Sequence, residues 1–246
     1  MLADVHMHLA QDPALSLERA KNAGVDIVLA AAMDVTTSRI NVILAEKFSQ
    51  VKACVGIHPW RSNLYNPEAE KTIAELIKGG KVTAISETGI DTVRCMSDDF
   101  RTELAPLPLE VQIKAFRAQV RLAINNDLFL VLHDRGATSE ILNVFDDFAE
   151  RPPRGIVHGF SGTIDEALMY RQRGFLIAIN KRDLPAINSI VETLTLNEIA
   201  LETDSNEPGN VVDVCEAVAL LKKVTRGEVE EATTANLKNL IDFGLS

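Results

Sequence analysis

The arrangement of hydrophobic residues most restricts the fold of this chain, because short apolar stretches alternate with longer amphipathic ones eight times. The short stretches are apolar at nearly every residue instead of every second one. That pattern is typical of parallel strands covered by helices. The expected strands are Leu2–His6, Asp26–Ala32, Lys52–Ile57, Val82–Glu87, Leu128–His133, Gly155–Phe160, Phe175–Ile179 and Glu198–Glu202.

The longer stretches have the residue spacing of amphipathic helices. Ile113, Phe116 and Val120 recur every three or four residues and form one helix face, and Gln112 and Arg117 are expected to point away from it. The expected helices are Leu15–Ala23, Thr37–Ser49, Pro67–Lys78, Leu109–Asn126, Thr138–Glu150, Ile164–Arg173, Leu184–Glu192, Val211–Val224 and Thr233–Phe243.

Eight strands separated by helices predict an α/β fold of the (β/α)₈ TIM-barrel type. The structural alternative is an open, doubly wound sheet, but no G-x-G-x-x-G segment follows the first strand to favour it. No linker rich in glycine or serine divides the chain, so we expect residues 1–246 to form a single domain.

Composition and charge exclude several classes of protein. The chain is 46% hydrophobic and 24% charged, and none of its apolar runs approaches the roughly 20 residues of a membrane span. Its three cysteines are widely spaced, and no basic segment with an apolar core opens the sequence. We therefore expect a cytoplasmic protein without disulfides. A net charge of −10 argues against coating of duplex DNA, although one pocket could still capture the end of a strand.

All five histidines lie at or just after the C-terminal end of an expected strand. In a barrel these strand ends converge on one face, where active sites are built. A single histidine is more often an ordinary hydrogen-bonded side chain, but this joint placement indicates a site. Two acids have the same placement, since Glu87 closes the fourth strand and Asp204 follows the eighth. The histidines are His6, His8, His58, His133 and His158.

These residue types favour a metal centre. Imidazole nitrogens and carboxylate oxygens without thiolates suit Zn²⁺, Mn²⁺, Fe²⁺ or Mg²⁺. His6 and His8 point to the same side of an extended strand, so they can reach one ion together. The candidate ligands exceed the needs of one tetrahedral ion and fit two ions about 3.5–4 Å apart. They are His6, His8, Glu87, His133, His158 and Asp204.

The two acids among these candidate ligands each have a further expected role. Glu87 is a natural bridge between two ions, and Asp204 could also act as the general base for an activated water. Position alone leaves ordinary alternatives open. Glu87 could be a solvated acid at a strand end, and Asp204 could be a helix N-cap or turn residue.

Positive charge is expected beside the same pocket. Arg135 follows His133 by two residues, and a guanidinium there suits a phosphate or a carboxylate, with a surface salt bridge as an equal alternative. Lys181 and Arg182, at the end of the seventh strand, would offer further charge to phosphates.

Short motifs along the whole chain, in order, resemble those of the TatD family of metal-dependent deoxyribonucleases and hydrolases, within the amidohydrolase superfamily. They are D-V-H-M-H at 4–8, G-I-H-P at 56–59, S-E-T-G-I-D at 86–91, H-D-R at 133–135, H-G-F-S-G at 158–162 and E-T-D-S at 202–205. The resemblance implies a distorted TIM barrel with a divalent metal centre and hydrolysis of DNA, often from 3′ to 5′ with a preference for single strands.

The resemblance also assigns roles by position. It places His6, His8, Glu87 and Asp204 on one ion, and Glu87, His133 and His158 on a second ion. Asp204 would double as the base, while His58 and Arg135 would contact the substrate phosphate. The chain departs from the family pattern at Ser86, in 92–108, in 180–182 and in 206–208. These segments are expected on or near the pocket rim, so they bear on the substrate more than on metal binding.

Three functions are consistent with the sequence. The first is a phosphodiesterase acting on DNA ends through a metal-activated water. The second is a small-molecule amide, ester or phosphoester hydrolase on the same two-metal centre, which the acidic composition and the altered rim mildly favour. The third is a barrel that only binds, and it is disfavoured because every candidate ligand is present. The sequence identifies neither the metal (Zn, Mg or Mn), nor a protein partner, nor a membrane association.

Overall fold

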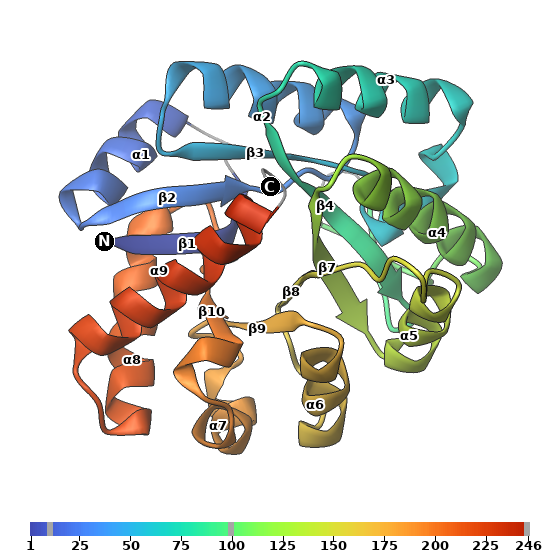
Figure 1. Ribbon diagram of the computed structural model, residues 1–246. Helices are drawn as coiled ribbons and strands as arrows, with labels where there is room; N and C mark the ends of the chain where they lie inside the picture. Colours follow the sequence, from blue (N-terminus) through green and yellow to red (C-terminus); the bar gives the residue numbers. More distant parts are fainter. Residues whose placement is uncertain (9–11, 98–100, 244–246) are drawn as a thin grey trace.

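The computed structural model describes residues 1–8, 12–97 and 101–243, and it confirms the TIM-barrel prediction (Figure 1). Eight parallel strands form one sheet in the order β1-β2-β3-β4-β7-β8-β9-β10. The strands are β1 (Leu2–Met7), β2 (Val25–Ala30), β3 (Val51–Val55), β4 (Val82–Asp91), β7 (Phe129–Arg135), β8 (Gly155–His158), β9 (Phe175–Ile179) and β10 (Ile199–Leu201).

Helices lie outside the strands and cover them. They are α1 (Pro13–Asn22), α2 (Val35–Lys47), α3 (Pro67–Lys78), α4 (Leu109–Asn125), α5 (Thr138–Asp146), α6 (Ile164–Gln172), α7 (Leu184–Thr193), α8 (Val211–Lys222) and α9 (Arg226–Phe243), with short 3₁₀ segments η1 (Pro59–Leu64), η2 (Leu196–Glu198) and η3 (Pro208–Asn210). The last helix begins seven residues earlier than the sequence periodicity predicts, at Arg226 instead of Thr233. A capping box explains this start, because Thr225 Oγ1 accepts from Glu228 N and the Glu228 carboxylate accepts from Thr225 N.

Hydrogen bonds at the C-terminal ends of β1 and β10 join the two ends of the strand order. Asp204 N donates to His6 O at 3.0 Å, and His8 N donates to Ser205 O at 2.9 Å. The buried carboxylate of Asp4 adds a third connection, since it accepts from both the backbone N and the hydroxyl of Thr203. The barrel is therefore joined through the segments that carry the candidate ligands.

The opposite end of the barrel is closed by α9. Its Leu237 and Leu240 pack with Val5 and Phe129, which point into the barrel interior, and Leu237 has no exposed surface. The Asn236 side chain donates to Leu196 O in η2 and to Ile199 O at the start of β10, both at 2.8 Å. A second and larger apolar layer lies between the strands and the outer helices.

Two segments differ from the expected elements near the C-terminal face. Strand β4 continues to Asp91 instead of ending at Glu87, because its pairing with β7 resumes after a register shift between Ile85 and Thr88. Gly89 permits this pairing, since a Cβ there would lie 1.9 Å from His133 O, and its φ is +144°. Within 92–108, β5 (Cys95–Met96) and β6 (Glu103–Leu104) form an antiparallel pair that the sequence does not predict.

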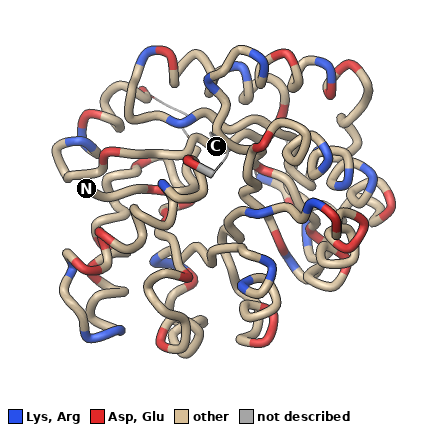
Figure 2. Tube along the Cα trace, viewed as in Figure 1, with Lys and Arg blue, Asp and Glu red and all other residues tan. Residues whose placement is uncertain are grey.

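Charged residues are spread over the outside of the molecule. Figure 2 shows acidic and basic positions interspersed along the outer helices instead of segregated by sign. Among the residues that the structure describes, no helix has the length and apolarity needed to cross a membrane.

The packing of α9 predicts the effect of one core substitution. We expect Leu237→Ala to lower the free energy of unfolding by about 2–5 kcal/mol, because it leaves a cavity in the barrel interior. Chemical denaturation measures this value. The matched control is Leu220→Ala on α8, where Leu220 is 82% exposed and the change should cost less than about 0.5 kcal/mol. Equal effects of the two substitutions would contradict the role of α9 as a closing element.

Candidate metal centre

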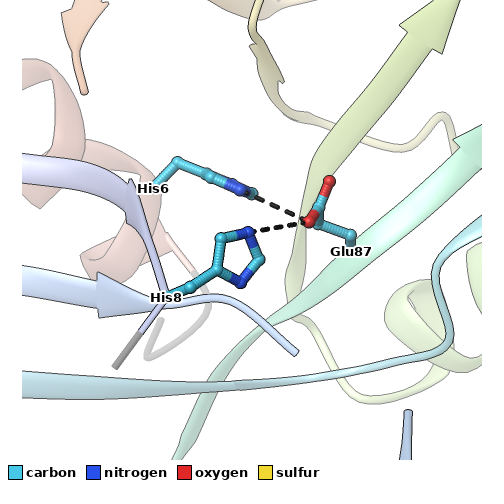
Figure 3. A group of neighbouring side chains, drawn as sticks. All are labelled: His6, His8 and Glu87. Carbon is cyan, nitrogen blue, oxygen red and sulfur yellow. Dashed lines mark ion pairs between the residues drawn. The ribbon is translucent and has the colours of Figure 1, made fainter. Parts of the chain in front are cut away.

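Glu87 lies at the middle of the polar cluster, and each oxygen of its carboxylate faces a different set of side chains. Oε1 is 3.4 Å from His6 Nε2 and 3.3 Å from His8 Nε2. Figure 3 shows both imidazole rings turned toward this carboxylate. The same two imidazole nitrogens are 3.7 and 3.6 Å from Asp204 Oδ1. His6, His8, Asp204 and Glu87 Oε1 therefore form a first donor set, contributed by β1 and the residue after it, by β4 and by the segment after β10.

The other oxygen, Glu87 Oε2, faces three histidines from the far side of the barrel. It is 3.3 Å from His58 Nε2, 3.3 Å from His133 Nδ1 and 2.8 Å from His158 Nε2. We call these three imidazoles and Glu87 Oε2 the second donor set. The first set is open to solvent through His8, whose side chain is 32% exposed, whereas the histidines of the second set are at most 7% exposed.

The cluster has the chemistry of a cation site. Neither ring nitrogen of buried His6 has a hydrogen-bond partner in the described part of the chain, and the same is true of His158 Nδ1 and Glu202 Oε2. Buried polar atoms without partners are costly, and a cation bound between His6 and Glu87 would satisfy His6 Nε2. One ligand atom each from His6, His8 and Glu87 lies within 4.8 Å of the others, as does one each from His58, Glu87 and His133. The residues therefore fit divalent metal ions.

Electrostatics favour the ionised form of both acids at the centre. Burial alone disfavours the charge on Glu87, but the imidazoles of His58, His158 and His6 outweigh it and hold the pKa of Glu87 well below its usual value. For Asp204, burial also raises the pKa. The hydrogen bond from His8 and the nearby His6 outweigh this effect and lower the pKa below that of an ordinary aspartate. Both carboxylates are therefore available as ligands or proton acceptors at neutral pH.

Asp91 fixes the orientation of His133, a contact that the sequence analysis missed. Its Oδ2 lies 3.0 Å from His133 Nε2 and accepts from Trp60 Nε1 at 2.8 Å. With Nε2 engaged, His133 presents Nδ1 to Glu87. The sequence contains a signal for this role, because Asp91 is the last residue of the motif that includes Glu87. The expected strand ended at Glu87, however, and so placed Asp91 in a loop.

Gln112 supports Asp91 from α4. Its amide accepts from Asp91 N at 2.8 Å and donates to Asp91 O at 3.0 Å. The expectation that Gln112 points away from the apolar face is wrong, since the residue is 1% exposed. The burial of a polar residue beside an apolar helix face cannot be read from sequence, because its side chain can enter the core when backbone groups there form hydrogen bonds with it.

Glu202 has a similar position behind His158. Its Oε1 accepts from Gly159 N at 2.6 Å and from Asn180 Nδ2 at 3.2 Å, and its Oε2 lies 3.8 Å from His158 Nδ1. Complete burial raises the pKa of Glu202 to about 7. This carboxyl group ties the segments after β8 and β9 to the back of the metal centre.

The remaining candidates have different positions relative to the cluster. His58, expected at the substrate phosphate, is buried within the second donor set, and its Nδ1 accepts from Trp60 N. Arg135 donates to Gly159 O and to the Ser161 hydroxyl. Arg182 contacts Asp204, but Lys181 pairs with Asp213 on α8 at 2.9 Å and does not join the cluster.

Comparison with known proteins agrees with this arrangement. The model of the family described as TatD related DNase matches residues 3–242. The chain is 27% identical to an uncharacterised metal-dependent hydrolase of Bacillus subtilis, YabD, over 98% of each chain. It is 25% identical to the 3′-5′ ssDNA/RNA exonuclease TatD of Escherichia coli, over 92% of this chain and 90% of that protein.

Among solved structures, a TatD homologue from Escherichia coli, YjjV, has the same fold. It superimposes with a TM-score of 0.84 and 24% sequence identity over 98% of each chain. The family match over nearly the whole sequence, together with the barrel and its cluster of histidines and acids, shows that this chain belongs to the TatD-related DNase family of metal-dependent hydrolases.

Proposed function

We propose that this hydrolase is a phosphodiesterase that removes nucleotides from DNA ends, in the manner of a 3′-5′ exodeoxyribonuclease. The observation that supports this proposal most is that the two carboxylate oxygens of Glu87 face two separate donor sets. Such a division suits two ions that act on the attacking and the leaving oxygen of one phosphoryl group. The names of two relatives point the same way, since one is a 3′-5′ ssDNA/RNA exonuclease and another, from Schizosaccharomyces pombe, is a deoxyribonuclease.

Each donor set would hold one divalent ion. His6, His8, Glu87 and Asp204 would hold the first, and Glu87, His133 and His158 the second, with His58 Nε2 within reach of the second. When bound, such ions supply Lewis acidity, which makes a water more acidic and neutralises charge on a phosphoryl oxygen. Zn²⁺, Mn²⁺ and Mg²⁺ all accept these ligands.

The side chains around the centre supply proton transfer and orientation. Asp204 is ionised at neutral pH and turns Oδ1 toward His6 and His8, so it can accept the proton of a water held at the first donor set. Asp91 fixes the ring of His133, and Arg135 would lie beside the phosphate of a bound nucleotide. In the proposed reaction the DNA end binds and Asp204 takes a proton from the attacking water. The water oxygen forms a bond to phosphorus as the bond from phosphorus to the leaving oxygen breaks, and the leaving oxygen takes up a proton from solvent.

A small-molecule hydrolase on the same centre is the second candidate. The net charge of −10 and the interspersed charges in Figure 2 favour it, because extended contact with a strand needs a basic face. The alternative uses the same donor sets and the same base, so only the substrate separates the two candidates.

An activity assay with metal removal tests the proposed function. We expect the protein with added Mn²⁺, Mg²⁺ or Zn²⁺ to shorten single-stranded DNA labelled at its 5′ end one nucleotide at a time, and chelation to stop the reaction. Chelation should also lower the thermal midpoint by about 5–10 °C, with recovery when the ion is restored. Protein that is inert on oligonucleotides with all three ions but active on amides or esters would favour the second candidate.

Glu87→Gln tests the shared carboxylate. We expect bound metal per chain, measured by elemental analysis after dialysis, to fall below about half of the wild-type value, because both donor sets lose their anionic ligand. Glu46→Gln on α2 makes the same chemical change at an exposed position and should retain full metal content. Unchanged metal content in the Glu87 variant would rule out the bridging role.

Asp204→Asn tests the general base. Side-chain volume is preserved but the proton acceptor is lost, so kcat should fall by about 10²–10⁴-fold while the circular dichroism spectrum is retained. Asp213→Asn on α8 is the matched control, and its kcat should be that of the wild type. Near-normal turnover in the Asp204 variant would exclude the residue as the base.

A further inference from the structure

Arg182 lies at the solvent-exposed side of the metal centre. Its Nη2 donates to Asp204 Oδ2 at 3.1 Å, and its side chain is 59% exposed. The other oxygen of Asp204 faces His6 and His8 in the first donor set. The second donor set is buried, whereas His8 and Arg182 both lie close to Asp204 and are partly or largely exposed, so Arg182 is on the more open side of the centre.

The segment after β9 holds this guanidinium in a fixed place. Asp183 N donates to Asn180 Oδ1 at 2.7 Å, and the buried Asn180 amide donates to Asp183 and to Glu202. Arg182 Nε and Nη2 in turn donate to the Asp183 carboxylate, both at 3.3 Å. The loop is thus tied to Glu202, behind the metal centre, and side-chain entropy is already restricted before a ligand arrives.

Arg182 retains capacity to bind an anion. Its Nη1 makes no hydrogen bond to any residue within 1–8, 12–97 or 101–243. Asp204, if it serves as a ligand as proposed, shares its charge with an ion, which weakens its hold on the guanidinium. A phosphoryl group matches the planar, paired donors of arginine better than a neutral ester or amide does.

The two neighbouring cations have different surroundings. Lys181 Nζ pairs with Asp213, which lies away from the centre. Arg135 Nη1 donates to the neutral acceptors Gly159 O and Ser161 Oγ beside His158, whereas Arg182 is in direct contact with the proposed base. Arg182 also lies in the 180–182 segment, where the sequence departs from the pattern that the family resemblance leads one to expect.

We propose that Arg182 binds the phosphoryl group of the substrate at the entrance to the metal centre and thereby selects anionic phosphoesters over neutral esters and amides. This inference rests on the proposed function, because it assigns a substrate class to the same site. Binding exchanges the contact of Arg182 with Asp204 for contacts with phosphoryl oxygens and leaves Asp204 to accept a proton.

The test compares Arg182→Gln with Lys181→Gln, which removes the same charge from the adjacent residue. With bis(4-nitrophenyl) phosphate as an anionic substrate, we expect Arg182→Gln to raise KM about 10- to 100-fold, with kcat within about threefold. With 4-nitrophenyl acetate as a neutral substrate, both constants should stay at wild-type values. Lys181→Gln should match the wild type on both substrates.

Inorganic phosphate gives a readout that does not depend on turnover. Titration calorimetry of the Mn²⁺-loaded protein should show about 10- to 100-fold weaker phosphate binding in Arg182→Gln and unchanged binding in Lys181→Gln. Unchanged phosphate binding would overturn the proposal. An equal loss of kcat on both substrates with unchanged KM would also overturn it, since that pattern belongs to a residue that only orients Asp204.

Failure of the proposed function would have a different signature. Wild-type protein would then cleave neither DNA nor the diester, and the phosphate titration would still decide whether Arg182 binds a phosphoryl group. If the wild type cleaves both substrates and Arg182→Gln behaves identically, the function stands and the role of Arg182 is rejected.

Discussion

The negative charge of Glu87 in the barrel interior is the constraint on which the candidate site depends. A buried carboxylate is costly unless cationic or hydrogen-bonding groups surround it. Here imidazoles from β1, β7, β8 and the residues after β1 and β3 point at its two oxygens. Neutral imidazoles alone cannot balance that charge. The cluster is therefore arranged for positively charged occupants, whether protons on the rings or metal ions between them.

The same segments close the barrel and form the site. The Asp4 side chain on β1 accepts hydrogen bonds from Thr203, which follows β10. In addition, Asp204 N donates to His6 O, and His8 N donates to Ser205 O. The positions of His6, His8 and Asp204 are consequently set by barrel closure, with no separate scaffold. At the other end, α9 fills the interior, so changes there should affect stability without altering the donor sets.

The sequence predicts the barrel and the convergence of histidines because both depend on repeated local patterns. A histidine at the end of each of several parallel strands must reach the same face, whatever the details of packing. What escaped prediction depends on contacts between distant segments. Asp91 and Gln112 meet only because β4 runs past Glu87, and the 3.3 Å approach of His58 Nε2 to Glu87 depends on the backbone turn that leads into η1. Lys181 and Arg182 are adjacent in sequence but diverge, and only the loop geometry after β9 separates their partners.

The bond between Asp4 and Thr203 joins residues 199 positions apart. His6 and His8 lie beside the first partner, and Asp204 lies beside the second. The first donor set is therefore complete only after the segment that follows β10 has packed against the first strand. Contacts between residues so far apart in the sequence also slow folding. The last strand of the barrel thus completes both the sheet and the donor set in one step.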